Sequence, residues 1–291
     1  TLRVHFETGY AAFADALADQ GTSALRVVPE DYNVSDPVGT GPFIFESFTP
    51  GERAVFKKNP NFWLEGEPYV DEVVLVNLTD DAARVNALIS GQVDVIAGVP
   101  TSQIGVLEGN QELSVISSET GGWNPITMRV DVAPFDDPRV REAFRLMADR
   151  QQMVDQVLAG RGTPANDIFA RFDPAYNASL PQREVNIERA KALLAEAGQS
   201  DLEVDLVTAP VAAGLVEAAQ SFAEMASGAG VKVNVLRVDG STFFTNHFLN
   251  APLSQSYWVT RNYLLQAADS MMPDSPYNET HWSHGEWQEL I

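Results

Sequence analysis

The 291-residue chain contains no cysteine. This absence excludes disulfides, thiolate zinc sites, cysteine-ligated iron–sulfur clusters and thiol nucleophiles. Basic residues are scarce as well, with 19 lysines and arginines against 40 acidic residues and a formal net charge of −21. Such a field repels phosphate backbones and anionic lipid surfaces, so nucleic-acid binding is disfavoured. No apolar run approaches the length of a membrane-spanning helix.

Hydrophobic residues make up 45% of the chain, enough for one large core or two smaller ones. Apolar and turn-forming residues predict strands at 2–6, 42–48, 53–57, 70–78, 93–96, 113–117, 126–130, 202–208, 231–238 and 253–259. They predict helices at 10–19, 80–90, 102–108, 138–149, 151–159, 187–197, 212–226 and 242–249. Strands separated by helices of this length indicate an α/β fold with helices on the faces of its sheets.

The clearest local pattern is "PFDDPRVREA" at residues 134–143. Asp136 or Asp137 suits the N-cap of a helix, and Pro138 suits its first turn. The apolar side chains at 140, 144 and 147 then fall on one helical face. Local physics therefore predicts a well-capped amphipathic helix here.

The same stretch resembles the "PFDD-x-RVR-x-A" segment of the family 5 extracellular solute-binding proteins, the dipeptide, oligopeptide and nickel-type receptors of ABC importers. Two further stretches are similar to motifs of this family. They are "GTGPF" at 39–43, followed by "NPNFW" at 59–63, and "AKALLAEAG" at 190–198. These three motifs occur in the family's order and span most of the chain, so the chain is identified by resemblance as a member of this family.

The resemblance implies a periplasmic-binding-protein-like fold of type II, cluster C, present in part. Residues 1–36 would end the second lobe, residues 37–121 would belong to the first lobe, and residues 122–291 to a truncated third lobe. The implied protein is a monomeric receptor, periplasmic or extracellular, that hands a peptide-like, sugar or anionic solute to an ABC permease. A signal segment and any lipid-anchoring cysteine would lie upstream. No catalysis and no cofactor are implied.

Candidate binding residues stand at the end of a predicted strand. Tyr257 and Trp258 lie at the end of the predicted strand 253–259, and Arg261 follows it directly after Thr260. Ligands of open α/β sheets bind at the carboxyl ends of strands. Tyr257 and Trp258 face opposite ways, so at most one of them points into a cleft. The alternative interpretation is that Trp258 packs in a core and Arg261 is solvated.

The resemblance adds weight to these residues. In dipeptide receptors the corresponding "W-x-x-D" segment lines the cleft, and its acidic residue holds the ligand's ammonium group. Arg261 occupies that acidic position here, which favours an anionic or hydroxyl-rich solute. Trp123 and Asn124 follow Gly121-Gly122 where the family chain crosses between lobes. Trp123 is expected either to cover a ligand or to pack between lobes, and the glycines to permit hinge torsion.

Other chemistry has weaker support. His281 and His284 with Glu286 could suggest a metal site, and nickel-type receptors make metal-chelate binding the competing function. "SHGE" at 283–286 also fits a helix capping box, which would explain these residues structurally. "GTG" at 39–41 lacks the spacing of a nucleotide loop, and no serine stands in a hydrolase elbow. An enzyme is therefore disfavoured.

Overall fold

The computed structural model describes residues 3–7, 9, 13–18 and 26–290. The chain divides into two compact units, residues 1–97 and residues 98–291. Each unit contains one β-sheet. The division of the chain into three lobes at 36/37 and 121/122 stays a prediction.

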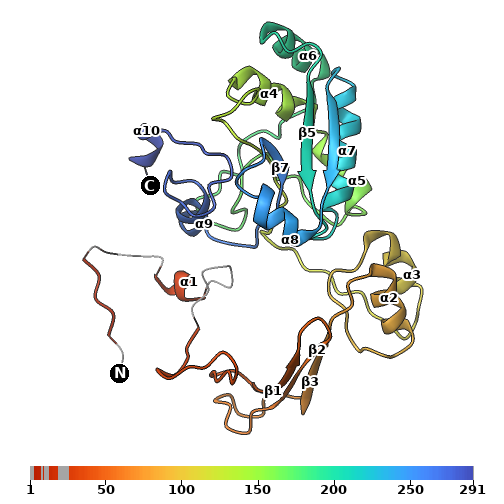
Figure 1. Ribbon diagram of the computed structural model, residues 1–291, viewed down its shortest axis with the longest axis vertical. Helices are drawn as coiled ribbons and strands as arrows, with labels where there is room; N and C mark the ends of the chain where they lie inside the picture. The colour runs from red at the N-terminus through yellow and green to blue at the C-terminus, as the bar shows by residue number, and fades with distance from the viewer. Residues whose placement is uncertain (1–2, 8, 10–12, 19–25, 291) are drawn as a thin grey trace. The chain divides into compact units, whose positions relative to one another are not determined.

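The first unit contains a three-stranded antiparallel sheet in the order β1 (Phe43–Thr49), β2 (Arg53–Lys58) and β3 (Glu72–Val76), as Figure 1 shows. The hairpin of β1 and β2 confirms the sequence prediction. At its turn, Gly51 has a φ of 77°, a left-handed conformation that suits glycine. Asn59 fastens the hairpin's open end, because its backbone N–H donates to the Pro42 carbonyl at 2.9 Å and its side chain donates to the Gly41 carbonyl at 3.0 Å.

Helices α1 (Phe13–Ala18) and α2 (Asp81–Ile89) also belong to the first unit. The Asp80 side chain caps α2 by accepting a 2.8 Å hydrogen bond from the Ala83 N–H, which confirms the predicted helix at 80–90. Positions 10–12 and 19 of the predicted first helix lie outside the described residues. So does position 2 of the predicted first strand, and residues 3–6 form no strand.

The second unit contains a mixed four-stranded sheet in the order β4 (Ile126–Met128), β7 (Leu253–Gln255), β5 (Glu203–Thr208) and β6 (Lys232–Arg237). β5 runs parallel to β6 and β7, whereas β4 runs antiparallel to β7. Figure 1 shows β5 and β6 side by side with α7 (Leu215–Ser227) along them. A mixed sheet flanked by helices is the predicted fold class.

Helices α4 (Pro138–Met147), α6 (Ile187–Glu196) and α7 form the core of this unit against one face of the sheet. Phe144 of α4 lies in this core with its ring 5.1 Å from that of Phe135 and 5.8 Å from that of Phe222. Successive strand residues face opposite ways, so Leu206 joins this core. Val207 packs on the other face against Phe243, which begins the π-helical turn η2 (Phe243–His247) after α8 (Gly240–Thr242).

The remaining elements of the second unit are short. They are η1 (Thr101–Gln103), α3 (Ile104–Glu108), α5 (Arg150–Val157), α9 (Tyr263–Ser270) and α10 (Gly285–Gln288). The predicted strands at 93–96 and 113–117 are wrong, because neither segment pairs with a strand. Val95 and Ile116 are 82% and 91% exposed, so their β-branched side chains have no sheet to pack against. The predicted strand at 253–259 is regular only to Gln255.

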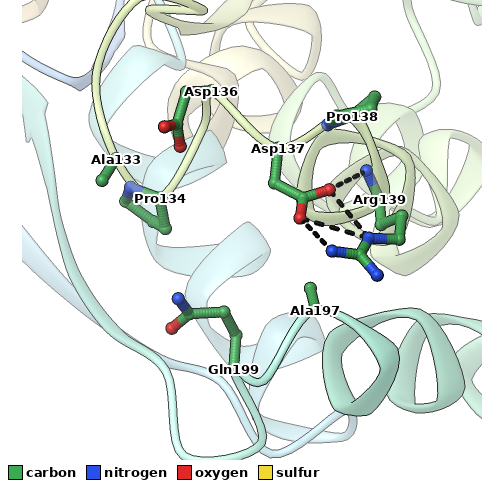
Figure 2. A pocket seen from close by; sticks show the side chains of 8 residues that line it. All are labelled: Ala133, Pro134, Asp136, Asp137, Pro138, Arg139, Ala197 and Gln199. Atoms are coloured by element: carbon green, nitrogen blue, oxygen red, sulfur yellow. Dashed lines mark hydrogen bonds and ion pairs between the residues drawn. The ribbon is translucent and has the colours of Figure 1, made fainter.

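The "PFDDPRVREA" motif fastens the start of α4 to the end of α6, as Figure 2 shows in part. Asp137 caps α4 by accepting a 2.8 Å hydrogen bond from the Arg139 N–H, and its carboxylate pairs with the Arg139 guanidinium at 2.5 Å. Arg139 also donates to the Glu196 carbonyl at 2.7 Å, in the last turn of α6. A surface recess of about 660 Å³ borders Asp137, Arg139 and Gln199. The motif has a structural explanation in these contacts.

Acid is expected to weaken this Asp137–Arg139 pair. The hydrogen bonds from Arg139 lower the pKa of Asp137 to about 2, whereas an unfolded aspartate titrates near about 3.9. The pair therefore stabilises the fold above about pH 4, and this contribution is lost as the pH falls through about 2. In urea unfolding between pH 5 and 2, Asp137→Asn should lose less stability on acidification than the wild type.

Asp136→Asn is the matched control for removing one acidic charge at the same loop, since Asp136 makes no ion pair in the described part of the chain. Equal pH dependence in Asp137→Asn and in the wild type would show that the pair does not stabilise the fold.

Candidate binding site

A cavity of about 1080 Å³ lies within the second unit. Its lining comes from three stretches of chain, 117–130, 141–176 and 258–287, with additional residues of α7. Of the residues predicted to bind a ligand, Trp123, Asn124 and Trp258 line this cavity, whereas Tyr257 and Arg261 do not. The structure thus brings three of the five together around one space.

The two tryptophans are held together by their backbones. The Trp123 N–H donates to the Trp258 carbonyl at 3.0 Å, and the Trp258 N–H donates to the Trp123 carbonyl at 2.9 Å. A Cβ on Gly122 would lie 3.1 Å from the Trp258 carbonyl oxygen, which explains glycine at this close approach. The Gly121 N–H donates to the Thr260 hydroxyl at 2.7 Å. Hinge torsion at these glycines stays a prediction.

Trp123 is also the first member of a stack of three aromatic rings. Its ring lies 5.6 Å from that of Phe169 at an interplanar angle of 15°, and Phe169 lies 5.6 Å from Tyr263 at 11°. Phe169 lines the cavity too. It was not predicted from the sequence, because it lies in an irregular segment with no periodic pattern. Stacking of this kind fixes the orientation of the Trp123 ring.

Trp258 is oriented by a buried carboxylate that the sequence analysis missed. Its indole Nε1–H donates to Glu279 Oε1 at 2.8 Å, and the Ser256 hydroxyl donates to Glu279 Oε2 at 2.7 Å. Glu279 is 7% exposed and lines the cavity. Burial raises the pKa of Glu279, and the hydrogen bonds from Ser256 and Trp258 oppose that rise.

The raised pKa of Glu279 predicts how its contribution to the stability of the fold changes with pH. A carboxyl whose pKa is higher in the folded state stabilises the fold below its unfolded pKa of about 4.3. That contribution is lost as the pH rises through the raised pKa of the folded state. Glu279→Gln should therefore show a smaller loss of unfolding free energy between pH 4 and 8 than the wild type in chemical denaturation.

Glu286→Gln, an exposed acidic position on α10, controls for the loss of one negative charge. If the wild type and Glu279→Gln lost stability in parallel as the pH rises, the burial of Glu279 would not govern its titration.

Arg261 is neither solvated nor exposed to the cavity. Its side chain is 2% exposed, and its Nη1 lies 2.5 Å from Asp269 Oδ2 in α9. The guanidinium carbon lies 6.0 Å from the centre of the Trp258 ring. The alternative interpretation of a solvated Arg261 is therefore wrong. A binding role for Arg261 and for Tyr257, which is 41% exposed, stays a prediction.

The histidines considered as metal ligands have other contacts. His281 Nδ1 lies 3.1 Å from Asp131 Oδ2, and its Nε2 lies 2.8 Å from the Leu249 carbonyl oxygen. His284 is the N-cap residue of α10 and forms no side-chain cap, so the predicted capping box from Ser283 is wrong. Residues 3–7, 9, 13–18 and 26–290 include no group of three or more His, Cys, Asp or Glu side chains placed to hold a metal ion.

Comparison with known proteins identifies the relatives of this chain. The glutathione-binding protein GsiB of Salmonella typhimurium is 30% identical over 206 residues, which are 69% of this chain and 40% of GsiB. GsiB of Escherichia coli O157:H7 is 28% identical over 202 residues. The chain therefore spans about 40% of the length of these curated relatives.

Solved structures share the fold. AgaA of A. tumefaciens R10, in complex with agropinic acid, is 25% identical with a TM-score of 0.76, over 89% of this chain and 55% of AgaA. NikA of Staphylococcus aureus, in complex with Ni(L-His)2, is 23% identical with a TM-score of 0.76, over 92% of this chain and 58% of NikA. These relatives and neighbours are binding proteins, and the predicted fold class is confirmed.

Among the helices that the structure describes, none has both the length and the apolar character to cross a bilayer.

Residues 1–277 match the family model described as "Bacterial extracellular solute-binding proteins, family 5 Middle". This match covers nearly the whole chain and includes all three sequence motifs. The chain belongs to family 5 of the bacterial extracellular solute-binding proteins.

Proposed function

We propose that this chain forms part of the receptor of an ABC importer and captures a small organic solute. The observation that carries the proposal is the cavity of about 1080 Å³ bordered by Trp123, Trp258 and Glu279 in a member of this family. Pockets for small molecules combine apolar and aromatic walls with a few placed polar groups, and this cavity has both. Its ligand class is peptide-like, sugar or anionic.

Capture works by population shift. A solute that touches both lobes only when they are closed favours the closed receptor, which the membrane permease then recognises. No bond of the solute is broken, and ATP hydrolysis belongs to the partner. The receptor acts as a monomer outside the cytoplasmic membrane, where a lipid anchor would keep it.

The relatives support an organic solute. GsiB is a glutathione-binding protein, and AgaA was solved with agropinic acid. NikA was solved with a nickel–histidine chelate, so a metal chelate is the competing ligand. The described residues offer no metal-binding cluster, and both ring nitrogens of His281 already contact oxygen atoms. These contacts favour the organic solute over the metal.

A thermal-shift screen tests the proposal. The panel contains reduced glutathione, the dipeptide Met-Leu, agropinic acid and nickel–histidine, with neutral sugars added. A ligand at 100 times its Kd adds about 2.7 kcal/mol to stability, enough to raise the Tm by several degrees. We expect one organic member to do so in a saturable way. A shift with the nickel chelate alone would favour the competing function, and turnover of a panel member would contradict both.

A further inference from the structure

Glu279 has hydrogen bonds but no counter-ion. Its two hydrogen-bond donors, the Ser256 hydroxyl and the Trp258 indole N–H, are both neutral. No basic side chain forms an ion pair with it in the part of the chain that the structure describes. An ionised carboxylate has about four lone-pair sites, so these two donors leave room for further hydrogen bonds. Burying such a charge without a cation is unfavourable.

The surroundings of Glu279 on the cavity side are aromatic. The Trp258 and Tyr277 rings meet edge to face with their centres 6.0 Å apart, and Trp282 also lines the cavity. Aromatic faces attract cations, most strongly where water is excluded. The positive charge of Arg261 near the Trp258 ring is balanced by Asp269 at 2.5 Å. A buried carboxylate and aromatic rings on one cavity wall form an environment suited to a positive group.

We propose that Glu279 is the docking point for a cationic group of the solute, an ammonium or a guanidinium. This inference rests on the proposed function, since it names the chemistry that the cavity selects. The cation supplies a further hydrogen bond and the missing counter-charge. The hydrogen bond from Trp258 to the same carboxylate holds the indole ring beside the bound group. The site discriminates against solutes in which this nitrogen is acylated, because an amide carries no charge.

The test uses ethylammonium and methylguanidinium chloride as probes on the ¹⁵N-labelled full chain at pH 7.5. The reporter is the indole Nε1–H resonance of Trp258, assigned by its loss in Trp258→Phe. In the wild type we expect both probes to shift this resonance in a saturable way, with sodium chloride and ethanol causing no saturable shift. In Glu279→Gln the apparent affinity should fall at least tenfold, although the amide oxygen can still accept from Trp258.

Glu286→Gln is the control, because it removes one exposed acidic charge on α10 at a position that does not line the cavity. It should retain cation binding. Equal probe shifts in the wild type and Glu279→Gln, or no shift with either cation in the wild type, would overturn the inference. If Glu279→Gln failed to fold, the wild type alone would decide through the contrast between ethylammonium and ethanol.

The results that would overturn the docking role of Glu279 differ from those that would overturn the receptor function. The thermal-shift assay compares Met-Leu, which has an ammonium group, with N-acetyl-Met-Leu, in which that group is a neutral amide. Equal binding of both peptides would overturn the docking role of Glu279 and leave the receptor function standing. A chain that bound the cations but no solute of the panel would keep the cation site and contradict the receptor function.

Discussion

Arg261→Ala is expected to lower the free energy of unfolding by about 3–5 kcal/mol. The substitution removes the ion pair with Asp269 at a site where the Arg261 side chain is 2% exposed and that of Asp269 18% exposed. Breaking a buried pair from one side is more costly than replacing both partners. The double variant Arg261→Met with Asp269→Leu should therefore recover part of the loss. Urea unfolding followed by tryptophan fluorescence measures all of these variants.

Arg189→Ala is the matched control. Arg189 pairs with Glu196 at 2.8 Å, but both side chains are about half exposed. Exposed pairs contribute about 0–1 kcal/mol, so this variant should remain close to the wild type. If Arg261→Ala were as stable as Arg189→Ala, the Arg261–Asp269 pair would not stabilise the fold. A loss of solute affinity in folded Arg261→Ala would instead support its predicted binding role.

Trp258→Ala is expected to weaken the affinity for the solute found by screening by about 30-fold or more. Buried tryptophans at binding sites contribute about 2 kcal/mol or more on truncation, and about 1.4 kcal/mol corresponds to a tenfold change in Kd. The reason is the place of Trp258 at the cavity wall, fixed by its backbone bridge to Trp123 and its bond to Glu279. Isothermal titration calorimetry, at a temperature where the variant is folded, measures the effect.

Trp63→Ala controls for the loss of a tryptophan, since Trp63 is 74% exposed and belongs to the first unit. Its Kd should match that of the wild type. Wild-type affinity in Trp258→Ala would remove Trp258 from the solute site and place the ligand away from this cavity.

Much of the fold could be predicted because its signals are local. The caps Asp80 and Asp137 act within three residues of themselves, and the "PFDDPRVREA" helix buries positions 140, 144 and 147 as its period requires. The β1–β2 hairpin follows from a Pro-Gly turn between two apolar runs. The strands predicted at 93–96 and 113–117 had the right composition but no neighbour to pair with. Strand propensity reflects how well a side chain packs on the surface of a sheet. The sequence of one segment does not show whether a neighbouring strand is there to form that sheet.

The candidate site was harder to predict for the same reason. Trp258 and Trp123 could be chosen as large rings near turns, but their pairing spans 135 positions of sequence. Glu279 was missed because glutamate is seldom buried, and its partners Ser256 and Trp258 precede it by more than 20 residues. Arg261 follows the end of the predicted strand, yet its ion-pair partner Asp269 lies eight residues downstream. The better sequence signal for a buried Arg261 would have been its ion-pair partner Asp269, which lies in the following helix, α9.

The proposed receptor binds a solute and releases it unchanged. The most direct measurement is calorimetric titration of the chain with the solute that raises its Tm, followed by mass spectrometry of the recovered solute. We expect saturable binding near one solute per chain, and a mass of the recovered solute identical to that of the starting solute. Chemical conversion of the solute, or the absence of saturable binding, would contradict the proposed receptor function.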